Sequence, residues 1–221
     1  MKQQKRITLL AGHYGSGKTN IAVNMALVLR EQYDHVAIAD LDIVNPYFRS
    51  KDSATELARR GIRLICSEYA NTNVDIPALP ADMYTLIDDS SLQAVVDVGG
   101  DDRGALALGR LAPAILEENN YDMLMVINGY RPLTRTVDEV LEVMKEIESA
   151  GKIPFTGIIN NSNLGAETTP ADVLASQALA QQVAEQTGLP LVMTTVDASL
   201  FDELQESIPN LFPLQLQRRA V

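Results

Sequence analysis

The sequence contains no tryptophan, few other aromatic residues and a single cysteine. That cysteine, Cys66, cannot form a disulfide within the chain and provides no paired-cysteine motif for a metal. Because Cys66 stands inside an apolar segment, we interpret it as a core residue. These absences argue against a disulfide-stabilised secreted scaffold and favour a reducing, cytoplasmic setting.

The chain also lacks a long apolar run. No stretch of 18 apolar residues occurs within its 221 residues, so we expect no membrane-spanning helix. Residues 1–6 are rich in basic side chains, but the apolar stretch that follows, Ile7–Ala11, is too short for the core of a signal peptide. We therefore interpret Ile7–Ala11 as a buried β-strand.

Basic residues are too few to balance the acidic ones. The 18 Lys and Arg residues and the 29 Asp and Glu residues give a formal net charge of −11 at pH 7. Sequence-independent binding of DNA requires a surface of Lys and Arg that neutralises phosphates, and this composition argues against it. A local basic patch stays compatible with the composition. The acidity itself is typical of a soluble cytoplasmic protein.

The chain alternates regularly between two kinds of segment. Short aliphatic and β-branched runs predict buried strands at Ile7–Ala11, His35–Ala39, Ile62–Cys66, Ala94–Val98, Met123–Ile127, Phe155–Asn160 and Leu191–Val196. Stretches of helical period lie between them, at Lys18–Gln32, Ser53–Arg60, 104–119, Thr134–Ala150 and Ala171–Thr187. The alternation predicts one α/β domain over residues 1–221, in which helices cover both faces of a doubly wound, mostly parallel sheet in three α/β/α layers. Ligands of such sheets bind outside the carboxyl ends of the strands.

The first strand end carries the clearest motif. The pattern Gly12-x-x-x-x-Gly17-Lys18-Thr19 follows the strand Ile7–Ala11 and opens a helix, which is the context that a phosphate-binding loop requires. Its glycines allow backbone N–H groups to point inward, and the helix N-terminus adds partial positive charge. We expect Lys18 to reach the β- and γ-phosphates of a nucleoside triphosphate and the Thr19 hydroxyl to ligate Mg²⁺. This predicts a P-loop NTPase fold whose nucleotide-contacting residues are Gly12, His13, Tyr14, Gly15, Ser16, Gly17, Lys18, Thr19 and Asn20.

Two later strand ends carry carboxylates. Asp40 and Asp42 stand two residues apart and therefore leave their strand on the same side. Near a magnesium–triphosphate, one is expected to hold a metal-bound water and the other to position the attacking water. The alternative is an ordinary Asx turn before Pro46. Asp97 closes a buried strand, where its charge needs a cation, so we predict that it serves Mg²⁺. Gly99 would let a backbone N–H approach the γ-phosphate.

A run of amides ends a further predicted strand. Guanine-specific sites commonly have Asn-Lys-x-Asp here, because a carboxylate accepts hydrogen bonds from guanine N1–H and N2–H₂. In this chain an asparagine takes the place of that aspartate, and Asn161 takes the place of the lysine. An amide accepts from adenine N6–H₂ and also donates to N1 or N7. We therefore predict an ATP site with Asn160 and Asn161 at the base; the alternative for a strand-end asparagine is turn chemistry.

Taken together, these residues resemble the deviant-Walker ATPases of the MinD/ParA and CobQ/CobB type, within the SIMIBI class. The resemblance rests on Gly15-Ser16-Gly17-Lys18-Thr19, the helix segment 18–26 with Asn24, Asp40 and Asp42 with Asn45-Pro46, and Asp97-Val98-Gly99-Gly100. It implies binding of ATP with Mg²⁺, catalytic roles for Lys18 and for Asp42 as the water-positioning residue, and Asp97 as the Walker B acid. It also places Asp197 at the base pocket and implies ATP-linked homodimerisation or docking of a protein partner.

The chain departs from this family at one position of the glycine loop. The family's signature is a lysine that reaches across a dimer to the partner's phosphates, and His13 stands in its place. Histidine is shorter than lysine and only partly charged at neutral pH, so we expect slow hydrolysis without a partner. Arg49, Arg103 and Arg131 are candidates for the missing cation, by analogy with arginine fingers. Alternatively, His13 is a loop residue without a catalytic part. Residues 101–103 are compatible with a switch loop or with a solvated acidic turn.

Three functions remain compatible with the sequence. The leading hypothesis is a Mg²⁺-dependent ATPase that uses the nucleotide to switch shape or partner. A nucleotide-gated interaction module with little hydrolysis is the second. The third is a small-molecule kinase or amide ligase, whose acceptor pocket would be lined by Tyr47, Arg49, Tyr130 and Arg131.

Two specialised roles of family members are not expected. Metal-inserting members carry paired cysteines, which the lone Cys66 cannot provide. Membrane-associated members end in a basic amphipathic helix, whereas Pro213 leaves too few residues for one here, and Arg218 and Arg219 attract a membrane only weakly.

Overall fold

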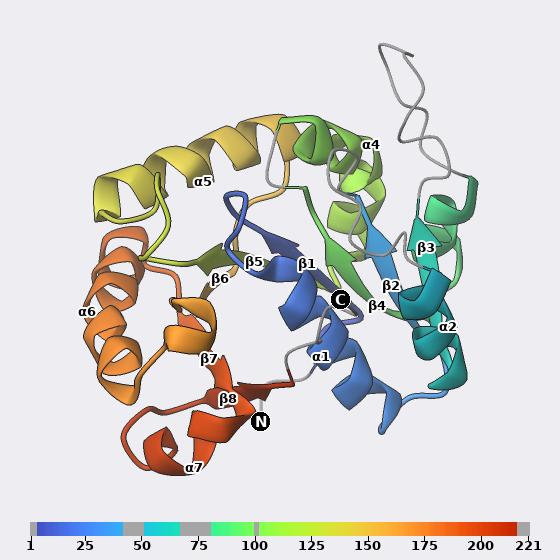
Figure 1. The fold of residues 1–221 in the computed structure, drawn as a ribbon. Coiled ribbons are helices and arrows are strands. Elements are labelled where there is room, and N and C mark those ends of the chain that lie inside the picture. Colours follow the sequence, from blue (N-terminus) through green and yellow to red (C-terminus); the bar gives the residue numbers. More distant parts are fainter. Residues whose placement is uncertain (1–3, 42–50, 67–80, 100–101, 216–221) are drawn as a thin grey trace.

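The computed structural model describes residues 4–41, 51–66, 81–99 and 102–215. Its centre is one sheet of eight parallel strands in the order β3-β2-β4-β1-β5-β6-β7-β8 (Figure 1). The strands are β1 (Ile7–Ala11), β2 (Val36–Asp40), β3 (Ile62–Cys66), β4 (Gln93–Asp97), β5 (Tyr121–Ile127), β6 (Gly157–Asn160), β7 (Leu191–Asp197) and β8 (Leu211–Leu214). Because all of them are parallel, their carboxyl ends meet along one edge.

Helices connect successive strands and cover both faces of the sheet. The α-helices are α1 (Lys18–Arg30), α2 (Lys51–Arg59), α3 (Thr85–Asp88), α4 (Asp102–Glu118), α5 (Val137–Gly151), α6 (Pro170–Thr187) and α7 (Phe201–Leu204). Short 3₁₀ turns occur at η2 (Ala81–Tyr84), η3 (Gly165–Glu167) and η4 (Ala198–Leu200). Within the described part of the chain, no helix is long and apolar enough to span a membrane.

Alternation along the central strands assigns each helix to a face. In β1, Leu9 packs in the cluster that contains residues of α4 and α5, whereas Leu10 packs in the cluster that contains residues of α1 and α2. Successive side chains of a strand point to opposite faces, so these two clusters are the two sides of the sheet. The result is a three-layer structure with α1 on one side of the sheet and α4 and α5 on the other (Figure 1).

The expected fold class is confirmed, and most expected elements lie within one or two residues of the observed ones. The strand predicted at His35–Ala39 runs one residue later, over Val36–Asp40, so Asp40 ends it. Strand β8, a four-residue edge strand that contains Pro213, was not predicted from the sequence. Proline has no backbone N–H to donate to a strand ladder and is tolerated at the edge of a sheet. A four-residue segment that contains proline therefore has little strand signal of its own.

Capping boxes set where two of the long helices begin. Helix α5 begins at Val137 rather than at Thr134, because Thr136 is its N-cap and exchanges hydrogen bonds with Glu139. Thr169 and Asp172 form the same arrangement at the start of α6. Each box satisfies backbone N–H groups that have no partner inside the helix.

Candidate functional site

The loop between β1 and α1 has a conformation that only glycine allows at two of its positions. Gly12 and Gly17 have φ angles of 149° and 90°. A Cβ atom on Gly12 would lie 2.5 Å from the Val126 carbonyl oxygen, and one on Gly17 would lie 2.2 Å from the Asn161 side-chain nitrogen. The loop therefore turns tightly against β5 and against the end of β6 before α1 begins.

Lys18 folds back over this loop. Its Nζ donates hydrogen bonds to the Gly12 carbonyl at 2.9 Å and to the His13 carbonyl at 3.3 Å, and the side chain is buried. Nδ1 of the His13 ring lies 3.1 Å from the Tyr14 carbonyl oxygen, and a hydrogen bond between them requires the tautomer with the proton on Nδ1. The ammonium group thus lies among loop carbonyls, where a phosphate oxygen would be a stronger acceptor.

The first turn of α1 contacts the end of β4. Thr19 Oγ1 donates a 2.5 Å hydrogen bond to Asp97 Oδ2. Asp97 and Asp40 are register partners on adjacent strands and are only 2% and 5% exposed. Because side chains alternate along a strand, the side chains of Asp97 and Asp40 lie on the same face of the sheet as Val95, which is the face that α1 covers. One hydroxyl and two buried carboxylates therefore meet beside the glycine loop.

These residues fit a magnesium–nucleotide complex. Within the described ranges, no group of three or more His, Cys, Asp and Glu side chains could hold a metal ion on its own. Magnesium is commonly held by one or two carboxylates together with waters and substrate phosphates, and not by a cage of protein ligands. Thr19, Asp97 and Asp40 provide that partial set of oxygen ligands at the end of the glycine loop.

Asn161 ties the glycine loop to the neighbouring strand ends. Its Nδ2 donates to the Ser16 carbonyl at 2.6 Å, and its Oδ1 accepts from Thr195 Oγ1 at 2.6 Å. The Asn161 backbone N–H donates to the Ile127 carbonyl at 2.8 Å. Loop, β5, β6 and β7 are thereby joined at one buried amide, which positions the loop.

Asn160 is also committed to contacts within the protein. It is fully buried, its Nδ2 donates to Ser176 Oγ at 2.9 Å, and its Oδ1 accepts from the Ser162 backbone N–H at 3.1 Å. Asn163 behaves similarly, since its Nδ2 donates to the Asn161 carbonyl and its Oδ1 accepts from the Gly165 N–H. These amides shape the loop between β6 and α6.

A cavity of about 170 Å³ opens beside the glycine loop. Its lining comes from the loop and α1, the turn after β5, the β6–α6 connection, α6, β7 and β8, and consists of Gly15, Gly17, Asn20, Arg131, Asn161, Ser162, Asn163, Gly165, Thr168, Val173, Thr195, Val196, Asp197 and Leu214. Asp197 Oδ1 accepts hydrogen bonds from the N–H and the hydroxyl of Ser199, which caps η4. The sequence-predicted residues at 15, 17, 20, 161 and 197 therefore surround one cavity.

The remaining predicted loop residues differ in exposure. Tyr14 is 61% exposed, whereas Ser16 is buried and its hydroxyl has no hydrogen-bond partner among the described residues. Gly99 lies against the start of α4, because a Cβ atom on Gly104 would come within 2.6 Å of the Gly99 Cα. The loop after β4 thus starts tightly packed against α4.

Several predicted residues lie outside the described part of the chain. These are Asp42, Asn45, Pro46, Tyr47, Arg49, Gly100, Asp101, Arg218 and Arg219, together with the side chains of Asp102 and Arg103.

Two residues that shape the site, Asn128 and Thr195, were not predicted from the sequence. Asn128 follows β5 and is buried; its Oδ1 accepts from the Tyr130 and Asn163 N–H groups. Thr195 holds Asn161 from β7. Asn128 is a polar residue after a buried strand, so the rule that singled out Asn160 also points to it. Thr195 lies within its strand, and no local pattern marks it.

Tyr130 has a structural task. Its hydroxyl donates to the Asp172 carbonyl oxygen at 2.8 Å, which ties the turn after β5 to the start of α6. Burial, and to a smaller extent the charge of Asp172, raise the pKa of Tyr130, so the phenol stays protonated and keeps donating. In this structure the Tyr130 hydroxyl therefore serves to hold the turn after β5 against α6.

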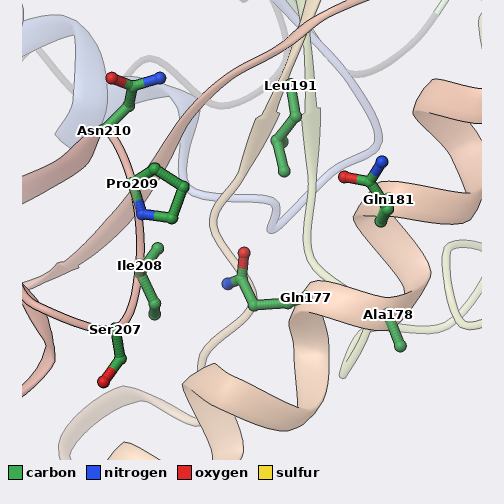
Figure 2. A pocket seen from close by; sticks show the side chains of 8 residues that line it. All are labelled: Gln177, Ala178, Gln181, Leu191, Ser207, Ile208, Pro209 and Asn210. Carbon is green, nitrogen blue, oxygen red and sulfur yellow. The ribbon is translucent and has the colours of Figure 1, made fainter.

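A second cavity, of about 420 Å³, lies away from the glycine loop between α6 and the segment before β8. Figure 2 shows the residues that line it: Gln177, Ala178 and Gln181 on α6, Leu191 on β7, and residues 207–210 before β8. No charged side chain is among its described lining, and Gln177 already accepts a hydrogen bond from Thr194. The larger cavity therefore lacks the charge that an anionic ligand needs, and the smaller one is the candidate site.

Comparisons with solved structures show the same fold. The chain is similar to the cell division protein FtsY of Thermotoga maritima, with a TM-score of 0.61 at 17% identity over 89% of this chain and 63% of that one. FtsY of Mycoplasma mycoides gives a TM-score of 0.60 at 18% identity, over 89% of this chain and 62% of that one. The 54 kDa signal recognition particle protein of Aeropyrum pernix, solved with GDP, gives 0.55 at 16% identity over 88% and 42%. This chain thus spans about three fifths or less of these proteins.

A sequence-family comparison is more specific than the shared fold. The CobQ/CobB/MinD/ParA nucleotide binding domain matches residues 7–168, which include the glycine loop, Asp40, Asp97 and the amides after β6. The match covers well over half of the chain. Within the matched residues, Gly15, Gly17 and the amides after β6 line one cavity, and Asp97 contacts Thr19 at the end of the glycine loop. The chain is therefore a nucleotide-binding protein that belongs to the CobQ/CobB/MinD/ParA nucleotide binding domain family.

Proposed function

We propose that this protein binds ATP with Mg²⁺ and hydrolyses it slowly, using the bound nucleotide to control docking of a partner. The observation that carries the proposal is the contact between Thr19 and Asp97 at the end of the glycine loop. It joins the hydroxyl that follows the loop lysine to the acid that ends β4, as a magnesium–triphosphate site requires. A cytoplasmic setting, expected from the composition, belongs to the same proposal.

Each described residue then has a defined task. The backbone of the glycine loop cradles the phosphates, and Lys18 exchanges its loop carbonyls for phosphate oxygens. Magnesium, when bound with the nucleotide, neutralises developing charge on the phosphates, and Thr19 with Asp97 and Asp40 would hold it. Asp42, which lies outside the described residues, keeps its proposed role of positioning water.

Slow hydrolysis and partner docking rest on His13 and on exposed apolar side chains in the loops that follow three strand ends. His13 supplies at most a partial charge where the related ATPases have a lysine. Three apolar side chains on the loops after β1, β5 and β6 are exposed to solvent: Tyr14, Leu133 and Leu164. Exposed apolar groups around a ligand site suit a protein interface, and we propose a second copy of this chain or a protein partner there. Light scattering with and without a non-hydrolysable ATP analogue tests the dimer.

Binding measurements on purified protein test the nucleotide proposal. We expect saturable Mg²⁺-dependent ATP binding by calorimetry and a loss of at least tenfold in affinity for Lys18→Ala, because a buried charge-assisted contact is removed. Lys145→Ala is the matched control, since Lys145 is exposed on α5 and far along the chain from the loop. Wild-type protein that shows no ATP binding, or Lys18→Ala that binds as well as Lys145→Ala, refutes the proposal.

Guanine is the second candidate base, and one observation favours it. The Asp197 carboxylate lines the cavity, and carboxylates suit the two N–H donors of guanine. Proteins of similar fold have also been solved with GDP. Asp197→Asn separates the candidates, because asparagine caps η4 equally well but presents only one acceptor oxygen. We expect it to leave ATP affinity within about threefold of wild type; a wild-type preference for GTP that this variant abolishes would establish guanine instead.

A further inference from the structure

Arg131 stands on a turn that hydrogen bonds hold from three sides. Its backbone N–H donates to the Asn128 carbonyl at 3.0 Å, and Thr134 Oγ1 donates to the same carbonyl at 2.8 Å. Tyr130 anchors the turn to α6, and the Gly129 N–H donates to Ser162 Oγ at 2.9 Å. The backbone that carries Arg131 is therefore preorganised, and its position owes little to the exposed side chain itself.

The Arg131 side chain lies between this turn and the glycine loop. Its Cδ and Nε atoms are each 3.9 Å from the position of a Cβ atom on Gly15. Arg131 lines the candidate cavity, where Asp197 is the other charged residue of the described lining. No ion pair found within the described ranges includes Arg131. A permanently charged guanidinium thus borders the phosphate-binding loop from a different strand end.

We propose that Arg131 contacts a phosphate group of the bound nucleotide from within the same chain. The inference rests on the proposed nucleotide function and deepens it, because it assigns a cation to a site in which position 13 is a histidine. A planar guanidinium donates two parallel hydrogen bonds to phosphate oxygens, which a lysine ammonium cannot match. The protein carries a formal net charge of −11, so a polyanionic ligand needs such local positive charge.

Competition binding on the full chain tests this contact. A fluorescent ATP analogue is displaced by ATP, by adenosine and by inorganic tripolyphosphate, for wild type, Arg131→Gln and Arg131→Lys. We expect Arg131→Gln to weaken ATP and tripolyphosphate about tenfold to a hundredfold, as loss of a charged hydrogen bond does, and to leave adenosine unchanged. The affinity of Arg131→Lys for ATP and tripolyphosphate should lie between those of wild type and Arg131→Gln, because lysine keeps the charge but loses the paired hydrogen-bond geometry.

Arg135→Gln is the matched control. Arg135 is exposed on the same turn, and its side chain is not part of the cavity lining. Arg131→Gln with wild-type affinity for ATP overturns the proposal, and so does an equal loss for adenosine, which would mean that the side chain packs on the nucleoside. If wild type binds none of the three ligands, the proposed nucleotide function itself falls. If wild type binds ATP and the Arg131 variants bind it equally well, the proposed nucleotide function stands and the Arg131 contact does not.

Discussion

Replacing Asn161 by alanine separates two tasks that an asparagine at this place can have, holding the glycine loop and reading the base. Its amide joins the Ser16 carbonyl to the Thr195 hydroxyl through two hydrogen bonds of 2.6 Å. Ser16 is 1% exposed and Thr195 is 2% exposed, so both groups have little access to water in the wild-type protein. Asn161→Ala therefore removes the hydrogen-bond partner of two buried groups.

The expected loss of stability follows from those partners. A buried polar group without a hydrogen bond costs about 1–3 kcal/mol. The Thr195 hydroxyl retains the Asn160 carbonyl at 3.4 Å as a weaker acceptor, whereas the Ser16 carbonyl has no other side-chain donor among the described residues. We expect Asn161→Ala to lower the free energy of unfolding by about 2–4 kcal/mol in total. For a chain of this size, that loss lowers the melting temperature by roughly 5–15 °C.

Calorimetry and nucleotide titration of the same samples provide the assay. We expect Asn161→Ala to melt earlier and also to bind ATP about tenfold more weakly, because the loop is no longer held in place. Thr195→Val is the matched control: it removes the hydroxyl but leaves the contact to Ser16, so it should lower stability with less effect on affinity. A variant at 161 that melts like wild type yet loses ATP affinity would refute the anchoring role and favour direct contact with the base.

Two further predictions concern the frame around the site. Asn24 accepts from the Gln215 N–H at 2.9 Å and donates to its carbonyl at 3.3 Å, so Asn24→Leu should raise hydrogen exchange at the end of β8 and leave β1 protected; unchanged exchange at residues 214–215 would contradict this. The Thr136 backbone N–H, then that of Arg135, lowers the pKa of Glu139, and the Thr169 hydroxyl lowers the pKa of Asp172. Because both pKa values are lower in the folded state, these carboxylates stabilise the fold above their unfolded pKa and lose that contribution as pH falls through the folded values. The melting-temperature gap between wild type and Asp172→Asn should therefore shrink as the pH falls below the ordinary aspartate pKa of 3.8, and a constant gap would speak against the capping role.

Local sequence patterns were sufficient for the fold class and for the phosphate loop. A strand, a glycine turn and a helix follow one another within residues 7–30, so their chemistry is visible without any distant contact. The same holds for Asp97, since a carboxylate that ends a buried strand is conspicuous in the sequence. Of the eight strands in the described part of the chain, seven were predicted from their aliphatic runs. The edge strand β8 was not, because a short segment with Pro213 gains its strand conformation only by pairing with β7.

The identity of each partner in the site depended on the order of the strands. Thr19 meets Asp97 across 78 residues, and Asn161 meets the Ser16 carbonyl across 145 residues, because β4 adjoins β1 on one side and β5 with β6 lies on the other. The sequence marked Asn160 and Asn161 for the base, but only packing determined that both amides are used within the protein. The sequence also indicated Arg49, Arg103 and Arg131 as candidates for the missing cation, without distinguishing among them. Side-chain positions across strand ends follow from the packing of the whole sheet, and such long-range contacts leave no local pattern in the sequence.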